Sequence, residues 1–261
     1  MSPTVKPLAA LAVASLTLAA GASSARADRR AFTRTYEYMT MPEGETELEF
    51  HSGQSRATLD GASPQSFDFA IEVEHGITDR WDISLYHVFE QTDAPLAADS
   101  QALHFAELKV ESRYRFSERG DLPVDIVAYG ELVKVFGERA YEGEAKLILA
   151  RDFDRLTAAV NLIGAVELEL GDETKAEPEY GWAAGLTYEV HPEIKLGAET
   201  WGAITEDETA SGEDLQVAGW AGPAVSWAPS SGLWMTSTLG LGVTDAADDV
   251  VFRLLIGMHL R

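Results

Sequence analysis

The sequence predicts an all-β fold, an up-and-down antiparallel β-barrel of about twelve strands, and three observations predict it. Most of the chain alternates apolar and polar residues with a period of two, which sends successive side chains to opposite faces of a strand. Clusters of Gly, Pro, Asp and Ser separate the alternating segments. These segments run to about 9–15 residues, whereas strands of globular sheets usually contain about five or six.

The alternation is clear in residues 156–170. Even positions are apolar, as at Leu162 and Leu168, and odd positions carry polar groups, as at Asn161 and Glu167. A strand with this pattern has one apolar and one polar face.

A break in the alternation predicts one β-bulge. Phe105 and Leu108 are both apolar but have opposite parity, so we expect an extra residue near Ala106. The expected strands, each uncertain by about two to four residues at its ends, span 44–52, 65–75, 81–90, 102–116, 123–135, 140–151, 156–170, 179–190, 194–204, 214–227, 233–244 and 249–260.

The connections between the expected strands form two alternating sets. One set is mostly short, at 76–80, 117–122, 152–155, 191–193 and 228–232. The other set contains the long polar stretches 53–64, 91–101, 171–178 and 205–213, together with short connections at 136–139 and 245–248. An even strand count, short turns at one end and longer loops at the other are typical of outer-membrane barrels.

The N-terminus predicts export. Lys6 precedes an apolar run over residues 8–20, and Ala25 and Ala27 form a small-residue cleavage signal. No later apolar run approaches the roughly 20 residues of a membrane helix, so the protein can span a membrane only as a closed barrel. The expected organisation is a signal peptide at 1–27, an N-terminal periplasmic segment or partial plug at 28–43, and an outer-membrane barrel at 44–261.

The aromatic residues indicate which face meets lipid, because a soluble lipocalin-like barrel would show the same alternation with its apolar face inside. Aromatic side chains gather near the short turns, at Trp81, Tyr114, Phe116, Tyr188 and Trp227, and near the loops, at Phe50, Phe67, Phe89, Phe136, Tyr141, Tyr180 and Trp182. Two aromatic girdles around an apolar band suit the two membrane interfaces. Small residues on the apolar face, such as Ala158 and Gly164, also favour lipid contact over a wide packed core.

The polar face then lines the lumen and is strongly acidic, with 17 acidic and 6 basic side chains. The expected lumen-lining residues include Glu72, Asp82, Glu107, Lys109, Glu111, Arg113, Glu131, Glu144, Lys146, Glu167, Glu199 and Arg253. So many carboxylates require hydration or pairing, so we expect a wet interior. About twelve strands lie between the eight that side chains can fill and the sixteen that leave an open channel. The pattern therefore allows either a narrow pore or a closed lumen.

Composition excludes several function classes. Removal of residues 1–27 takes away Lys6 and Arg26 and no acid, which leaves 18 basic and 43 acidic residues, a net charge of −25. Binding of nucleic acid requires a basic patch and is not expected. The chain contains no cysteine, so neither disulfides nor thiolate metal sites are available.

No catalytic, cofactor or metal site emerges from the motifs. No two histidines have the i, i+2 strand spacing or the i, i+4 helix spacing that would bring both to one metal ion. Ser84 and His87 have opposite parity, so they cannot form a catalytic dyad within one strand. We therefore expect no enzyme activity.

The chain resembles the outer-membrane transporter barrels grouped with the meta-pathway of phenol degradation. The resemblance rests on residues 32–50, in which Pro42 and Gly44 open a strand, and on the strand-turn-strand of residues 74–82. It implies an outer-membrane barrel that passes small, often aromatic or apolar compounds, and it identifies no ligand residue. The chain departs from many such barrels at its end, where Leu260 and Arg261 stand in place of a terminal aromatic residue.

Three functions remain open. A passive channel or uptake pore for small solutes predicts ion conductance, with cations favoured by the acidic lumen. A sealed structural or surface-interaction barrel predicts binding through the loops, and a soluble periplasmic ligand carrier predicts recovery in the aqueous fraction. The expected partners of the first two are outer-membrane lipid and the machinery that assembles outer-membrane barrels.

Overall fold

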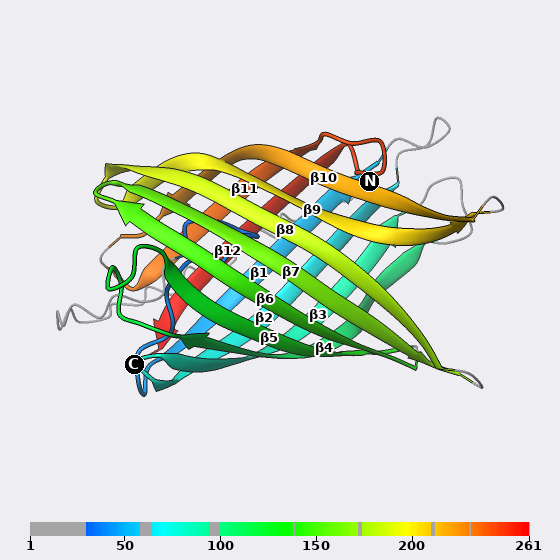
Figure 1. Cartoon of the computed structure of the whole chain (residues 1–261), viewed down its shortest axis with the longest axis horizontal. Helices are drawn as coiled ribbons and strands as arrows, with labels where there is room; N and C mark the ends of the chain where they lie inside the picture. Colours follow the sequence, from blue (N-terminus) through cyan, green and yellow to red (C-terminus); the bar gives the residue numbers. More distant parts are fainter. Residues whose placement is uncertain are drawn as a thin grey trace, which may run out of the picture.

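The computed structural model describes residues 30–57, 64–93, 100–137, 139–171, 174–209, 212–229 and 231–260. They form a closed barrel of strongly tilted antiparallel strands (Figure 1). Its twelve strands are β1 (Thr46–Arg56), β2 (Gln65–Thr78), β3 (Trp81–Asp93), β4 (Gln101–Arg115), β5 (Asp125–Val135), β6 (Ala140–Phe153), β7 (Leu156–Leu170), β8 (Thr174–His191), β9 (Ile194–Thr209), β10 (Gly212–Trp227), β11 (Leu233–Gly242) and β12 (Val250–Leu260). Within these ranges, no helix has the length and apolarity needed to cross a bilayer.

Each strand pairs with its neighbours in sequence, and the first strand pairs with the last. β1 and β12 are hydrogen-bonded from the pair Thr46 and Leu260 to the pair Arg56 and Val250, where Figure 1 shows the blue and red strands side by side. Closure leaves no open sheet edge. Backbone N–H and C=O groups of the wall are therefore satisfied without water, as an apolar surrounding requires.

The short connections lie at one end of the barrel, called here the short-turn end. They include the turns at 79–80, 154–155 and 192–193. At the opposite end, called the long-loop end, β1 ends at Arg56 and β2 begins at Gln65, and β3 ends at Asp93 and β4 begins at Gln101.

The sequence prediction of twelve antiparallel strands in a closed barrel is confirmed. The predicted bulge is also confirmed, because Val88 pairs with Glu107 while Phe89 pairs with Phe105, which leaves Ala106 unopposed. The proposed signal peptide, residues 1–27, lies outside the described residues.

Two predicted loops are wrong. Most of 171–178 and of 205–213 belongs to long hairpins of β7 with β8 and of β9 with β10. Polar residues on both faces suggested loops there. Strand pairing depends on backbone hydrogen bonds, however, and a hairpin wetted on both faces loses the apolar alternation.

The two faces of the wall have opposite chemistry. In β3, Asp82, Ser84 and Tyr86 point inward and are buried, whereas Trp81 and Ile83 point outward and remain about 40% exposed. Exposed large apolar side chains continue around the barrel, including Leu132, Leu162 and Tyr180 among many others. The fold therefore has a polar interior inside an apolar outer surface, the reverse of a soluble barrel.

Candidate functional site

The interior contains the N-terminal segment, defined here as residues 30–43, at the short-turn end. Glu199 on β9 holds this segment by its backbone. Its Oε1 accepts hydrogen bonds from the backbone nitrogens of Arg34 (2.6 Å) and Thr35 (2.5 Å), and its Oε2 accepts one from the backbone nitrogen of Thr33 (3.1 Å). Three successive N–H groups that converge on one anion form a nest, so a single buried carboxylate fixes the turn of the segment.

Side chains from three other strands hold the same segment. Asn161 on β7 forms two hydrogen bonds with the backbone of Tyr36, accepting from its nitrogen at 2.6 Å and donating to its oxygen at 2.9 Å. The Tyr36 hydroxyl donates to Glu111 on β4 at 2.9 Å. Ser226 on β10 donates to the backbone oxygen of Arg30 at 3.2 Å. The segment is thus tied to several sides of the barrel rather than to one strand.

Two glycines of the wall provide the space that the segment occupies. A Cβ atom at Gly185 on β8 would lie 2.3 Å from the Phe32 ring, and one at Gly76 on β2 would lie 1.9 Å from the Pro42 carbonyl oxygen. Any side chain at either position would clash. The close approach of the segment therefore depends on these glycines.

The strand register aligns glutamates in two rows along the inner wall from β1 to β8. The first row of paired positions is Glu47, Glu74, Ser84, Glu111, Glu131, Glu144, Ala165 and Glu179. The second row is Glu49, Glu72, Tyr86, Lys109, Val133, Glu142, Glu167 and Glu177. Each row starts near the first residues of β1, at the short-turn end, and reaches β8 near its first residues, toward the long-loop end. The strong tilt of the strands is visible in Figure 1.

Directly opposed carboxylates repel one another, and lysines offset part of this repulsion. Lys109 Nζ lies 2.9 Å from Glu107 and 3.8 Å from Glu131, and Lys146 Nζ lies 2.8 Å from Glu144. These lysines are partly exposed to the interior rather than fully buried. The middle of the rows is therefore a mixed-charge zone.

Nearer the short-turn end, Arg113 is the centre of a buried network. Its guanidinium contacts the carboxylate of Glu74. It also lies 2.8 Å from the carboxylate of Asp82 and 3.3 Å from that of Glu111. All four side chains are at most 3% exposed. Removal of the arginine would leave buried carboxylates without compensation, a change that typically costs about 3–5 kcal/mol.

Cavities run from the long-loop end down to the N-terminal segment. The mouth cavity, of 740 Å³, is lined by Glu142, Glu167, Lys175, Glu177, Glu179 and Glu206 among others. It shares Glu142 with an inner cavity of 370 Å³, whose lining includes Arg30, Arg34 and Tyr36 of the N-terminal segment. The cavities therefore end on that segment.

The twelve residues named above as lumen-lining are either buried or line one of these two cavities. Glu72, Asp82, Glu111, Arg113 and Glu199 are buried. Glu107, Lys109, Glu131, Glu144, Lys146 and Arg253 line the inner cavity, and Glu167 lines the mouth cavity. Ser84 is buried inside whereas His87 is exposed outside, as their opposite parity predicted.

Sequence reasoning missed several interior residues. Trp201 and Trp220 stack inside the barrel, with ring centroids 6.1 Å apart and planes at 15°. Trp201 shares its parity with Glu199, so the alternation could have placed it inside. His51 lies between Glu49 and Glu72, a grouping that a search for paired histidines could not find.

A family model matches residues 24–244 of this chain, and its description is a family of unknown function, DUF6662. The chain belongs to this family. No curated protein matches the chain. The family match does not support the narrower grouping with the phenol meta-pathway that residues 32–50 and 74–82 suggested.

Several solved structures share the fold. The COG4313 outer-membrane channel from Pseudomonas putida F1 is 12% identical with a TM-score of 0.66, over 88% of this chain and 100% of that chain. The NanC porin is 11% identical with a TM-score of 0.55, over 82% of this chain and 100% of that chain. The KdgM porin in complex with disordered oligogalacturonate is 9% identical with a TM-score of 0.55, over 82% and 99% of the two chains. At this identity the likeness establishes the fold, that of outer-membrane barrels.

Proposed function

We propose that this DUF6662 protein is an outer-membrane channel that passes small cationic solutes through a narrow, acidic lumen. The observation that carries the proposal is the pair of glutamate rows on the inner wall, whose members Glu142, Glu167, Glu177 and Glu179 line the mouth cavity at the long-loop end. Rings or rows of one charge concentrate ions of the opposite charge. The solved structures with this fold include an outer-membrane channel and two porins, which supports the channel part of the proposal.

The apolar outer surface supports a location in a lipid bilayer. Exposed outward residues such as Leu162 and Leu186 would meet acyl chains, and aromatic residues such as Trp81 and Tyr114 would lie at an interface. The short-turn end then faces the periplasm. Export through a signal peptide cleaved near Ala27 and insertion by the outer-membrane assembly machinery are parts of the same proposal.

The N-terminal segment narrows the periplasmic half of the proposed channel. Its residues Ala31, Phe32 and Thr35 have no exposed surface, so little free volume remains around them. The same observation favours a second candidate function, a barrel sealed by the segment that serves a structural or surface-interaction role. The two candidates differ in whether ions pass the segment.

Single-channel recording in planar bilayers tests the proposal. The mature protein is compared with a variant that lacks residues 30–38, and heat-modifiable migration verifies that each barrel is folded. We expect a small, cation-selective current from the mature protein and a larger current from the deletion variant. A current only after deletion would favour the sealed barrel, and no current from either protein would refute a channel.

The chemical class of the solute follows from charge. Five glutamates and one lysine line the mouth cavity, so cations should enter more readily than anions. The resemblance to phenol meta-pathway barrels instead predicts aromatic or apolar solutes, and uptake of radiolabelled phenol compared with a small amine separates the two. We propose passage rather than turnover, so neither solute should be chemically altered.

A further inference from the structure

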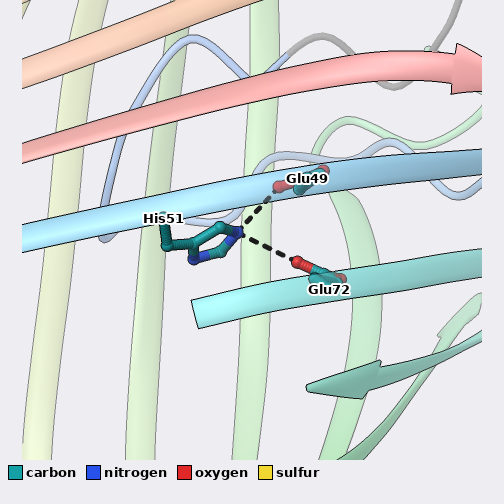
Figure 2. Close-up of side chains that lie close together, drawn as sticks. All are labelled: Glu49, His51 and Glu72. Atoms are coloured by element: carbon teal, nitrogen blue, oxygen red, sulfur yellow. Dashed lines mark hydrogen bonds and ion pairs between the residues drawn. The ribbon is translucent and has the colours of Figure 1, made fainter. Parts of the chain in front are cut away.

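Three side chains that can ligate a metal ion meet on the inner wall between β1 and β2. Figure 2 shows His51 pointing toward Glu49, on its own strand, and toward Glu72, on the neighbouring strand. His51 Nε2 lies 2.9 Å from Glu49 Oε2 and 3.1 Å from Glu72 Oε2. One donor atom from each residue lies within 4.8 Å of the others. These residues are called here the β1–β2 triad.

Strand geometry explains why the three residues meet. Glu49 and His51 are two positions apart, so they share the inner face of β1. Glu72 is the direct partner of Glu49 in the antiparallel register. All three side chains are at most 3% exposed, so their donor atoms are held by the wall and have almost no access to bulk water.

The polar groups of the triad do not satisfy one another. The two carboxylates are directly opposed and buried, an arrangement that costs free energy unless a cation compensates it. An imidazole Nε2 carries at most one proton, and its hydrogen bond goes to Glu49. Glu72 Oε2 points to the same nitrogen but, among the described residues, receives no hydrogen bond. Buried polar atoms without partners are rare in folded proteins and call for an explanation, such as a bound ion.

Arg30 of the N-terminal segment does not supply the missing partner. It interacts electrostatically with Glu49 and Glu72. Its guanidinium, however, stacks over the Tyr36 ring at 4.2 Å and donates to the backbone oxygen of Thr33. Its charge reduces the repulsion in the triad and leaves the Glu72 oxygen without a donor.

We propose that Glu49, His51 and Glu72 bind one divalent transition-metal ion, with Zn²⁺ as the model. One imidazole and two carboxylates favour such an ion over Mg²⁺ or Ca²⁺, which prefer oxygen ligands alone. Tetrahedral bonds of about 2.0–2.2 Å place two donor atoms roughly 3.3–3.5 Å apart, so His51 and the carboxylates need to separate by only a few tenths of an ångström. His51 also lines the inner cavity, which gives the ion a route of entry and space for a water as fourth ligand.

Calorimetric titration of the folded, untagged protein with Zn²⁺ in detergent tests the site, after dialysis against a chelator. We expect one ion per chain, with the affinity lowered at least ~10-fold in Glu72→Gln and in His51→Ala, because each change removes a ligand. The matched control is His259→Ala. His259 lies 3.8 Å from one carboxylate, that of Glu45, and belongs to no comparable group of three among the described residues.

Binding of Co²⁺ gives a second readout, since its visible absorption reports the ligands directly and should change in the triad variants but not in the control. Heat-modifiable migration identifies any triad variant that fails to fold. In that case Glu49→Gln is titrated in place of the variant that failed. Absence of stoichiometric binding would overturn the proposal. Binding that Glu72→Gln and His51→Ala leave unchanged would also overturn it, because the ion would then sit on surface acids. The proposal does not require that the barrel conduct.

Discussion

Gly185 is the single residue whose replacement should displace the N-terminal segment most directly. In Gly185→Val, the new side chain would occupy the place of the Phe32 ring, because even a Cβ atom would lie 2.3 Å from it. We expect the barrel to fold and the N-terminal segment to be displaced from its position inside the barrel. Arg30 and Arg34 would then become accessible to trypsin. Mass spectrometry of the digest measures the cleavage.

Gly164→Val is the matched control for this prediction. Gly164 lies in β7, and a Cβ atom there would have no neighbour within 4 Å. The control should remain as resistant to trypsin as the wild type. Equal cleavage of the two variants would mean that a β-branched residue in the wall, rather than the loss of space for Phe32, loosens the segment.

The two faces of β7 should respond oppositely to changes in charge. Leu162 points outward and is 53% exposed. Leu162→Arg should therefore destabilise the barrel in lipid vesicles by about 2–4 kcal/mol, the cost of a cation near the bilayer midplane. Glu167→Gln, on the opposite face, should change the free energy of unfolding little. Urea titration of vesicle-embedded protein measures both, and similar losses would contradict the assignment of faces.

At the scale of whole elements, Glu199 connects β9 to the N-terminal segment and should control how tightly the segment is held. Hydrogen bonds to a charged group contribute about 1.5–3 kcal/mol each, and three backbone donors of the segment share this carboxylate. Glu199→Gln should raise the rate of trypsin cleavage at Arg34 by at least ~10-fold. Glu206→Gln, on the same strand but at the mouth, should leave that rate unchanged. If trypsin cleaved Arg34 in neither variant, contacts other than those of Glu199 would be sufficient to hold the N-terminal segment in place.

The elements differ in how far their sequence determines them. β3 and β12 could be predicted with their faces because each strand carries its own alternation. The Ala106 bulge was also predictable, since it shifts that alternation locally. The N-terminal segment has no such period, and its partners Asn161 and Glu199 are more than 100 residues away in sequence. Its place in the interior follows from closure of the barrel, which no local pattern encodes.

The β1–β2 triad shows where prediction from local alternation ends. Parity alone assigns Glu49, His51 and Glu72 to the inner face. Their meeting also requires the register between β1 and β2, in which Glu49 faces Glu72. That register depends on the length and path of the connection between the two strands, so one residue more or less would separate the carboxylates or turn one outward.

For the molecule as a whole, the distribution of charge predicts selectivity that weakens as salt rises. The polar face predicted from the sequence carries 17 acidic and 6 basic side chains. A conducting lumen lined by this face should therefore favour cations. At about 0.1 M ionic strength the screening length is roughly 10 Å, and near 1 M it falls to about 3 Å. The cation-to-anion permeability ratio, measured as a reversal potential across a salt gradient, should therefore approach that of free diffusion at high salt.

Two double variants locate the charges responsible. Glu167→Gln with Glu179→Gln removes two carboxylates that line the mouth cavity. We expect the cation-to-anion permeability ratio at low salt to fall by about twofold or more, because the cavity walls concentrate the field of these groups. Asp245→Asn with Asp249→Asn removes the same charge from exposed positions in the connection between β11 and β12 and should have a smaller effect, since solvent screens those groups. Equal effects would assign the selectivity to net charge rather than to the glutamate rows, and an anion preference in the wild type would contradict the proposed path for cations.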